Sequence, residues 1–239
     1  MSEKGASTSS VFGRACAFMD RLETFLNGTV PSHGAVADEF VSTNKRTDQS
    51  YEPRFFKKYI VPSVYRFLTD SEHYEPGNAR KAVLAEGFAD KVLHDFSSDT
   101  PASKLCYPYK KSIVATLRTA KTDWWATTPR LSQSCPDLAL RSPCEHRIVF
   151  EGKLFRTGSV EMGRSAIVNG IFESFFYRGL PTLLSGKEQD GSGYDFGCFL
   201  AYDASPQGSL WTAWAKINGK VAQSCLEGLN VRVMVLRKE

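Results

Sequence analysis

Several features that mark membrane, secreted and strongly charged proteins are missing from this sequence. Its 239 residues contain no apolar run long enough to cross a bilayer, and the amino-terminal stretch MSEKGASTSS lacks the apolar centre of a signal peptide. We therefore expect a cytoplasmic protein with no membrane contact. The formal net charge is only +4, which permits a polyanionic partner without requiring one.

The cysteine and histidine patterns argue against other kinds of site. The six cysteines form no CxxC pair, which indicates neither a zinc ribbon nor a disulfide framework. Cys135, Cys144 and His146 lie near one another, but their spacing does not match a structural zinc site. The sequence also lacks a GxSxG motif and a P-loop, so acyl transfer and nucleotide hydrolysis have little support.

The composition fits one large domain or a core with a smaller appendage, since 42% of the residues are hydrophobic and 23% are charged. Polar residues 1–10 are expected to form a disordered tail. Helical periodicity predicts a helical region over residues 11–78, which ends at the turn sequence HYEPGN. Residues 79–239 are expected to form the core.

One basic segment in the helical region has two interpretations. The sequence RFFKKYIVPSVYRF interleaves aromatic residues with Arg54, Lys57, Lys58 and Arg66. These cations could hold a phosphate backbone while the aromatic rings stack on bases. The other interpretation, which the sequence favours, is an amphipathic helix, kinked near Pro62, with a basic outer face.

The core begins with a predicted helix over residues 79–96, on which Glu86 shares a face with apolar residues. A carboxylate on a buried face is unfavourable unless it is paired or holds a metal. Two other interpretations remain open, namely an arginine partner for Glu86 and a helix tilt that exposes it.

The remaining pattern predicts an α/β sandwich around a mixed sheet. Strands are expected at 111–120, 137–141, 146–156, 195–205 and 230–238, and a helix capped by Ser159 is expected to end at Gly179 and Pro181. Residues 209–226 suit either a helix or a pair of strands. The apolar side of the 159–178 helix is predicted to include Val160, Ile167, Val168, Ile171, Phe172 and Phe175.

The stretch from Cys135 to Phe155 carries charged residues where a strand core would be apolar. In HRIVFEGKLF the alternation places Glu151 and Lys153 on one face, with Ile148 and Phe150 on the other. If residues 137–141 pair with this strand through the turn at Ser142 and Pro143, Asp137 comes near Glu151. Two adjacent carboxylates repel each other, and Mg²⁺ or Mn²⁺ is the simplest way to stabilise both in the ionised form.

Pro136 and Asp137, followed by Glu151, Gly152 and Lys153, resemble the signature of the PD-(D/E)XK nuclease superfamily. The order of predicted elements over residues 79–200 also resembles that family. The resemblance implies a restriction endonuclease-like core, an α/β fold with a mixed sheet flanked by helices. The helix that follows lacks the Gln-x-x-x-Tyr series of the exonuclease branch and contains Asn169, Glu173 and Tyr177 instead, which argues against that branch.

The resemblance also implies roles for individual residues. Asp137 and Glu151 would bind Mg²⁺, which Mn²⁺ could replace, and the carbonyl oxygen of Gly152 would add a ligand. Lys153 would orient the attacking water. Glu86 would supply an acid from the preceding helix. Arg164 of the following helix either approaches a phosphate or pairs with Glu86. Lys57 and Lys58 belong to the basic segment, which the resemblance does not explain, and are further candidates for DNA contacts.

By the same resemblance we expect a DNA endonuclease, of type II restriction or related defence type, that acts on double-stranded DNA as a homodimer. The helical region would then supply dimer contacts or DNA contacts. One alternative is a non-catalytic DNA-binding or assembly module with the same fold, in which the charges are structural. Another is a structure-specific or RNA nuclease that uses the same site.

Overall fold

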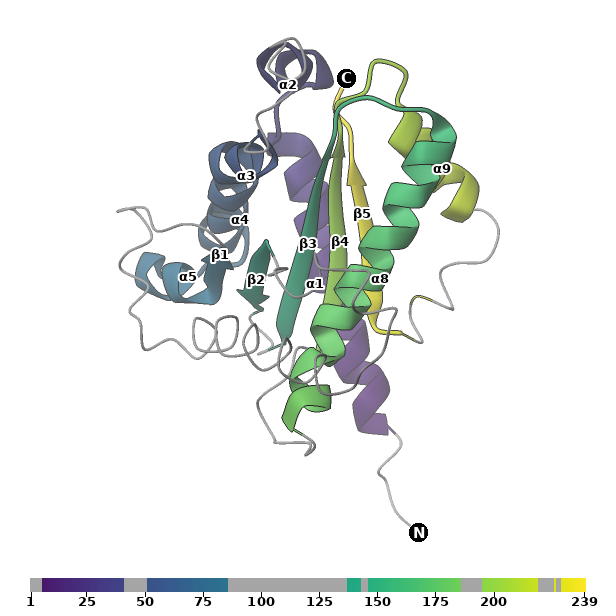
Figure 1. Ribbon diagram of the computed structural model, residues 1–239. Coiled ribbons are helices and arrows are strands. Elements are labelled where there is room, and N and C mark those ends of the chain that lie inside the picture. The colour runs from purple at the N-terminus through teal and green to yellow at the C-terminus, as the bar shows by residue number, and fades with distance from the viewer. Residues whose placement is uncertain are drawn as a thin grey trace.

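The computed structural model describes residues 6–40, 51–85, 137–142, 146–185, 195–218, 226 and 229–239 (Figure 1). Its helices are α1 (Ala6–Thr29), α2 (His33–Phe40), α3 (Tyr51–Phe55), α4 (Val61–Arg66), α5 (Pro76–Ala82), α8 (Val160–Ser185) and α9 (Ser209–Asn218). Two π-helical turns, η1 (Phe56–Ile60) and η2 (Phe67–Ser71), follow α3 and α4. The strands are β1 (Val83–Ala85), β2 (Leu138–Arg141), β3 (Arg147–Phe155), β4 (Phe196–Asp203) and β5 (Val231–Leu236).

The strands form one mixed sheet in the order β1-β2-β3-β4-β5. The pairs β1–β2 and β2–β3 are antiparallel, whereas β3–β4 and β4–β5 are parallel. Parallel neighbours need long connections, and the segments that contain α8 and α9 supply them. The predicted α/β class with a mixed sheet flanked by helices is therefore confirmed, as is the antiparallel pairing of the strands around Asp137 and Glu151.

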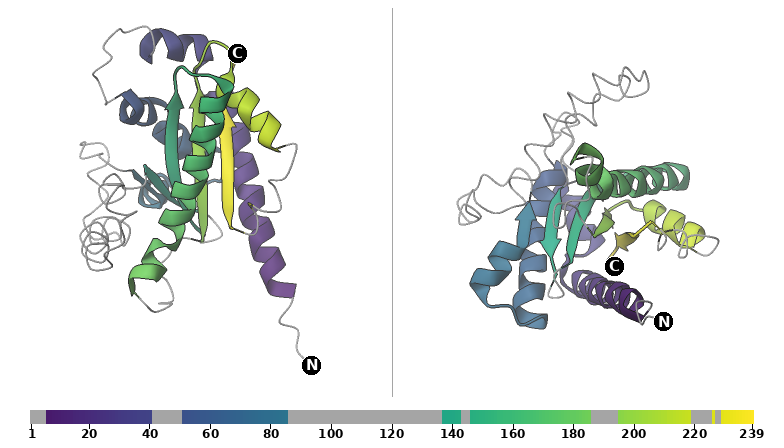
Figure 2. Two further views of the ribbon diagram at one scale, coloured as in Figure 1. Left: turned by 45° about the vertical axis from the view of Figure 1, so that its right-hand side comes forward. Right: turned by 90° about the horizontal axis from the view of Figure 1, so that it is seen from below.

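Helices cover both faces of this sheet (Figure 2). Buried side chains of α1, α3, η1 and α4 share one hydrophobic cluster with Leu138, Ile148, Phe150 and Leu154. Buried side chains of α8 and α9 form a second cluster with Phe155, Phe199, Ala201 and Val233 on the opposite face. Because side chains alternate along β3, the strand contributes to both clusters, and its even-numbered residues lie in the cluster that contains α1, α3, η1 and α4.

The boundary expected at residue 78 falls inside α5, and the helical region shares its core with the sheet. α1 begins at Ala6, within the segment predicted to be a tail; residues 1–5 lie outside the described part. The helix predicted over 79–96 is wrong for residues 83–85, because α5 ends at Ala82 and Val83 enters β1. Glu86 and the strand predicted at 111–120 lie outside the described residues.

Two further predictions are corrected in the carboxyl-terminal half. α8 continues through Gly179 and Pro181 to Ser185, so neither residue ends the helix. Val168, Phe172 and Phe175, assigned to its buried side, are 56%, 52% and 39% exposed. α9 decides the open assignment of residues 209–218 in favour of a helix. Among the described helices, none has the length and apolar character needed to span a membrane.

The segment from Tyr51 to Ser71 is one helical stretch in which α-helical and π-helical hydrogen bonding alternate, with three changes between them. Pro62 has no N–H to donate and its ring disturbs the preceding turn. Just before it, the N–H of Val61 reaches back to the carbonyl oxygen of Phe56, a π-type bond. This turn positions Phe55 and Phe56 in the core, with Tyr51 and Glu52 at the end of the helix that approaches β3.

Candidate functional site

The site lies along the edge of β3 that extends beyond β2. β2 pairs with β3 only as far as Leu138, which faces Phe150, so no strand among the described residues pairs with residues 151–155 on that edge, which we call the open edge. On this edge, two carboxylates accept the backbone N–H groups of β3. The N–H of Gly152 donates to Asp137 Oδ2 at 2.7 Å, and the N–H of Leu154 donates to Glu52 Oε2 at 2.9 Å.

Asp137 and Glu151 come together as the hairpin pattern predicted. The register pairs Leu138 with Phe150, and the N–H of Asp137 donates to the carbonyl oxygen of Phe150 at 3.1 Å. Asp137 therefore stands opposite Glu151. Because the N–H and C=O of one strand residue lie on the same edge, the carbonyl group of Gly152 also lies on the side of Asp137.

Glu151 is the most strongly perturbed acid of this site. Burial is the largest cause, followed by the negative charges of Asp137 and Glu173, a hydrogen bond with Glu173 and the charge of Glu52. Together these effects raise the pKa of Glu151 to about 10. Glu151 therefore keeps its proton at neutral pH unless a positive charge reaches it.

Lys153 forms an ion pair with Glu52 of α3. Its Nζ lies 3.1 Å from Glu52 Oε2, the same oxygen that accepts the Leu154 N–H. Burial acts to lower the pKa of Lys153, but the charge and hydrogen bond of Glu52 outweigh it, so the pKa is raised overall. The ammonium group therefore stays charged next to the acids.

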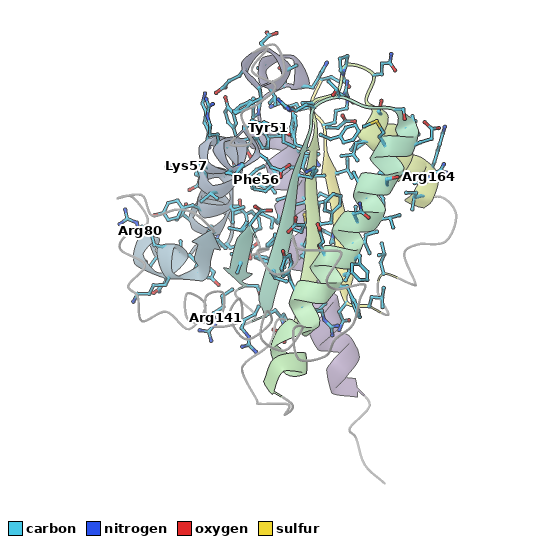
Figure 3. All side chains as sticks on the ribbon, viewed as in Figure 1. Tyr51, Phe56, Lys57, Arg80, Arg141 and Arg164 are labelled. Atoms are coloured by element: carbon cyan, nitrogen blue, oxygen red, sulfur yellow. The ribbon has the colours of Figure 1, made fainter. Side chains whose placement is uncertain are left out.

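A cavity of about 610 Å³ opens between β3, α3 and α8 beside these residues. Its walls include Tyr51, Glu151, Lys153, Arg156, Asn169 and Glu173. A glycine at position 170 allows α8 to approach the sheet closely, because a Cβ there would overlap the ring of Phe199. Figure 3 shows Tyr51 and Phe56 on the side of β3 that faces α3.

The predicted site residues have different outcomes. Asp137, Glu151, Gly152 and Lys153 come together at the edge of β3. Glu86 lies outside the described residues, so the acid expected from the preceding helix has no described position.

The three candidates for DNA contacts lie apart from that edge. Arg164 is exposed on α8, and Figure 3 places it across the sheet from Lys57. Lys58 binds Glu39 on α2 with an Nζ to Oε1 distance of 2.7 Å. Arg80 and Arg141, both exposed, lie on the same side as Lys57 (Figure 3).

Sequence reasoning missed two acids. Glu173 was noted in the sequence only as a residue of the helix that follows the strand with Glu151 and Lys153, and no role was assigned to it. Glu52 is 102 positions from the backbone N–H that it binds, and no local pattern connects the two.

All the nearby anionic groups are carboxylates, and oxygen is the donor that Mg²⁺ and Mn²⁺ prefer. In the described ranges, however, no three His, Cys, Asp or Glu side chains are arranged so that they could hold an ion as they stand. Asp137 is turned toward Gly152, and Glu151 is bonded to Glu173. The donor chemistry therefore fits a hard divalent cation, and binding one would require these side chains to turn.

Comparison with known proteins gives no further guide: no family model, no curated protein and no solved structure matches the chain.

Proposed function

We propose that the protein is a metal-dependent endonuclease of PD-(D/E)XK type that hydrolyses phosphodiester bonds of DNA. The observation that carries the proposal is the meeting of Asp137 and Glu151 beside Lys153, at an open strand edge that faces a cavity. A purely structural ion pair would not raise the pKa of Glu151, and that raised pKa reflects burial of the carboxyl first and the neighbouring acids Asp137 and Glu173 second.

Each residue of the site would have its own role in hydrolysis. In the reaction water adds across a P–O bond: oxygen joins phosphorus, and one hydrogen ends on the leaving oxygen. The Lys153 ammonium orients the attacking water and stabilises negative charge that develops on the phosphoryl oxygens. Asp137, Glu151 and the carbonyl oxygen of Gly152 would hold Mg²⁺ or Mn²⁺. When bound, this ion lowers the pKa of water and neutralises phosphoryl charge.

The order of the described elements supports a restriction endonuclease-like core. Helices precede β1, the hairpin β2–β3 carries the acids and the lysine, and α8 and β4 follow. We take the substrate to be double-stranded DNA and the active form to be a homodimer, because a two-fold duplex suits a two-fold protein. A type II restriction enzyme or a related defence nuclease has these properties.

The main alternative is a non-catalytic DNA-binding or assembly module. Asp137 and Glu52 satisfy two N–H groups of an otherwise open strand edge, and a purely structural role would place them in the same way. A structure-specific or RNA nuclease is a further alternative, which shares the site and differs in its substrate.

The test compares wild type with Asp137→Asn and Lys153→Met on plasmid DNA, branched DNA and RNA, each with Mg²⁺, Mn²⁺ or chelator. Asparagine keeps an oxygen acceptor for the N–H of Gly152, so this variant removes charge and preserves the strand edge. Glu72→Gln is the matched control, because it also removes one acid, from an ion pair with Arg21 that involves no residue of β3.

We expect metal-dependent cleavage by wild type and Glu72→Gln, and a loss of about 100-fold or more in both site variants. Titration calorimetry with Mn²⁺ provides a second readout, in which Asp137→Asn should bind the ion more weakly. DNA binding that is equal in chelator and in metal, without cleavage of any substrate, would favour the binding module. Cleavage restricted to RNA or to branched DNA would replace the proposed substrate.

A further inference from the structure

Glu52 has contacts that go beyond capping a strand edge. It lies in the first turn of α3, and its Oε2 accepts both the N–H of Leu154 at 2.9 Å and the ammonium of Lys153 at 3.1 Å. One oxygen atom therefore binds the side chain of Lys153 and the backbone of the next residue, Leu154.

The direction of these contacts determines where the ammonium lies. Odd-numbered side chains of β3 face α8, and Lys153 accordingly lines the cavity. Glu52 instead stands at the β2 edge of the strand, where the Leu154 N–H points. It draws the ammonium toward the edge that also carries Asp137. The N–H groups of Gly152 and Leu154, which these two acids cap, are two residues apart, a spacing of about 7 Å along a strand.

Glu52 is itself held by its surroundings. The ring of its neighbour Tyr51 lies under the guanidinium of Arg156, with 3.3 Å between Cζ and the ring centroid. Arg156 Nη1 donates to the carbonyl oxygen of Phe40 at 3.0 Å. On the other side of Glu52, Phe55 is fully buried in the core. The first turn of α3 is thus attached to the end of β3 by several contacts.

We propose that Glu52 is the positioning residue of this site, which holds the ammonium of Lys153 at the open edge of β3, the edge on which Asp137 also lies. This inference rests on the proposed nuclease function for its catalytic consequence, but not for the contact itself. Glu52 acts through Lys153, so its loss should slow the chemical step and leave DNA binding unchanged.

The ion pair should contribute little to stability. The side chains of Lys153 and Glu52 are 43% and 23% exposed, and ion pairs that reach solvent typically contribute less than about 1 kcal/mol. The hydrogen bond to Leu154 is different, since removing it leaves an N–H at the strand edge without its partner. Substitutions that separate the two contacts therefore distinguish positioning from capping.

The test uses Glu52→Gln, Glu52→Ala and the control Glu72→Gln in the full chain. Glutamine retains an oxygen for the Leu154 N–H but loses the charge that holds Lys153, whereas alanine loses both contacts. The first readout needs no nuclease activity: the rate of reductive methylation at Lys153, quantified by mass spectrometry of peptides. The second readout is single-turnover DNA cleavage together with the DNA dissociation constant.

We expect Lys153 to be methylated several-fold faster in Glu52→Gln than in wild type or Glu72→Gln. Cleavage by Glu52→Gln should fall by about 10-fold to 100-fold with an unchanged dissociation constant. Its melting temperature should match wild type, while Glu52→Ala should melt lower.

Unchanged methylation and unchanged cleavage in Glu52→Gln would overturn the inference. The same holds if cleavage falls only in proportion to stability across the variants. If no preparation cleaves nucleic acid, the nuclease proposal fails; faster methylation in Glu52→Gln would still support the positioning of Lys153, and unchanged methylation would refute it.

Discussion

A glycine occupies the middle of the ExK motif because the ring of Phe56 fills the space where a side chain would project. A Cβ at position 152 would overlap this ring, and Phe56 is itself almost fully buried. The π-helical turn η1 places the ring there. Residue 152 therefore couples the packing of the amino-terminal helices to the geometry of Glu151 and Lys153.

This contact predicts a compensating pair of substitutions. Gly152→Ala alone should lower the free energy of unfolding by about 1–3 kcal/mol, because the ring of Phe56 cannot move freely in the core. In a Phe56→Leu background the same substitution should have a smaller effect. Urea unfolding of the four proteins of this cycle measures the coupling energy. Additive effects would show that Phe56 does not restrict position 152.

The pKa of Glu151 predicts how stability depends on pH. The pKa rises from 4.5 in the unfolded chain to about 10 in the folded protein, so the folded state retains a proton that the unfolded state loses. The free energy of unfolding therefore falls as pH rises through this window, by at most about 1.4 kcal/mol per pH unit.

In chelator, the melting temperature of wild type should accordingly decrease from pH 6 to pH 9 more steeply than that of Glu151→Gln. Scanning calorimetry at several pH values measures this difference in slope. Equal slopes in the two proteins would contradict the assigned environment of Glu151.

At the scale of single elements, a buried acid at the end of β4 binds the first turn of α9. Asp203 is fully buried at the end of β4, and its carboxylate accepts hydrogen bonds from Ser205 and from the N–H of Trp211 in the first turn of α9. Arg237 donates to the carbonyl oxygen of Ser205 at 2.8 Å. One side chain thus connects β4 to the start of the helix.

We expect Asp203→Ala to lower the free energy of unfolding by about 3–5 kcal/mol, because several donors lose a buried acceptor at once. Asp70→Ala removes an exposed acid of η2 and should change it by less than about 1 kcal/mol. Urea denaturation curves compare the two. A small effect of Asp203→Ala would mean that other groups cap α9.

α8 presents a matched pair of neighbours with opposite exposure. Ile167 is fully buried, whereas Val168 is 56% exposed. Val168→Thr should change the free energy of unfolding by less than about 0.5 kcal/mol, and Ile167→Thr should lower it by about 2 kcal/mol or more. Thermal and urea unfolding measure these changes. Similar decreases in the free energy of unfolding in both variants would mean that Val168 is packed against another part of the protein.

At the scale of the whole molecule, the amino-terminal helices and the sheet share one hydrophobic core, so we expect them to unfold as one cooperative unit. Residues of α1 share a hydrophobic cluster with β4 and β5, and Arg232 of β5 forms ion pairs with Asp20 and Glu23 of α1. A chain that begins at residue 30 should therefore lose cooperative thermal unfolding, as followed by circular dichroism. A sharp transition in this truncated chain would mean that the region is dispensable.

The parts of this molecule that could be predicted from sequence are those set by local patterns. The hairpin that joins Asp137 to Glu151 depends on alternation and a short turn, and both signals are contained within twenty residues. The role of Glu52 depends on a contact across 102 positions, which no periodicity reveals.

The face of α8 was misjudged for a related reason. Apolar residues such as Val168 and Phe172 lie on the exposed side of the helix, so hydrophobicity alone did not report burial. The direction in which α8 packs is set by Gly163 and Gly170, which allow close approach to α9 and β4.

The contacts between the two ends of the chain have a consequence for synthesis on the ribosome. The backbone N–H of His33 bonds to Lys238, and the Nζ of Lys238 bonds to the carbonyl oxygen of Gly28. Although domains generally fold in the order of translation, α1 emerges first and cannot complete its packing until β5 has been made. The part of the apolar face of α1 that packs on β4 and β5 must therefore stay uncovered until those strands have been made, a period in which a chaperone can bind it.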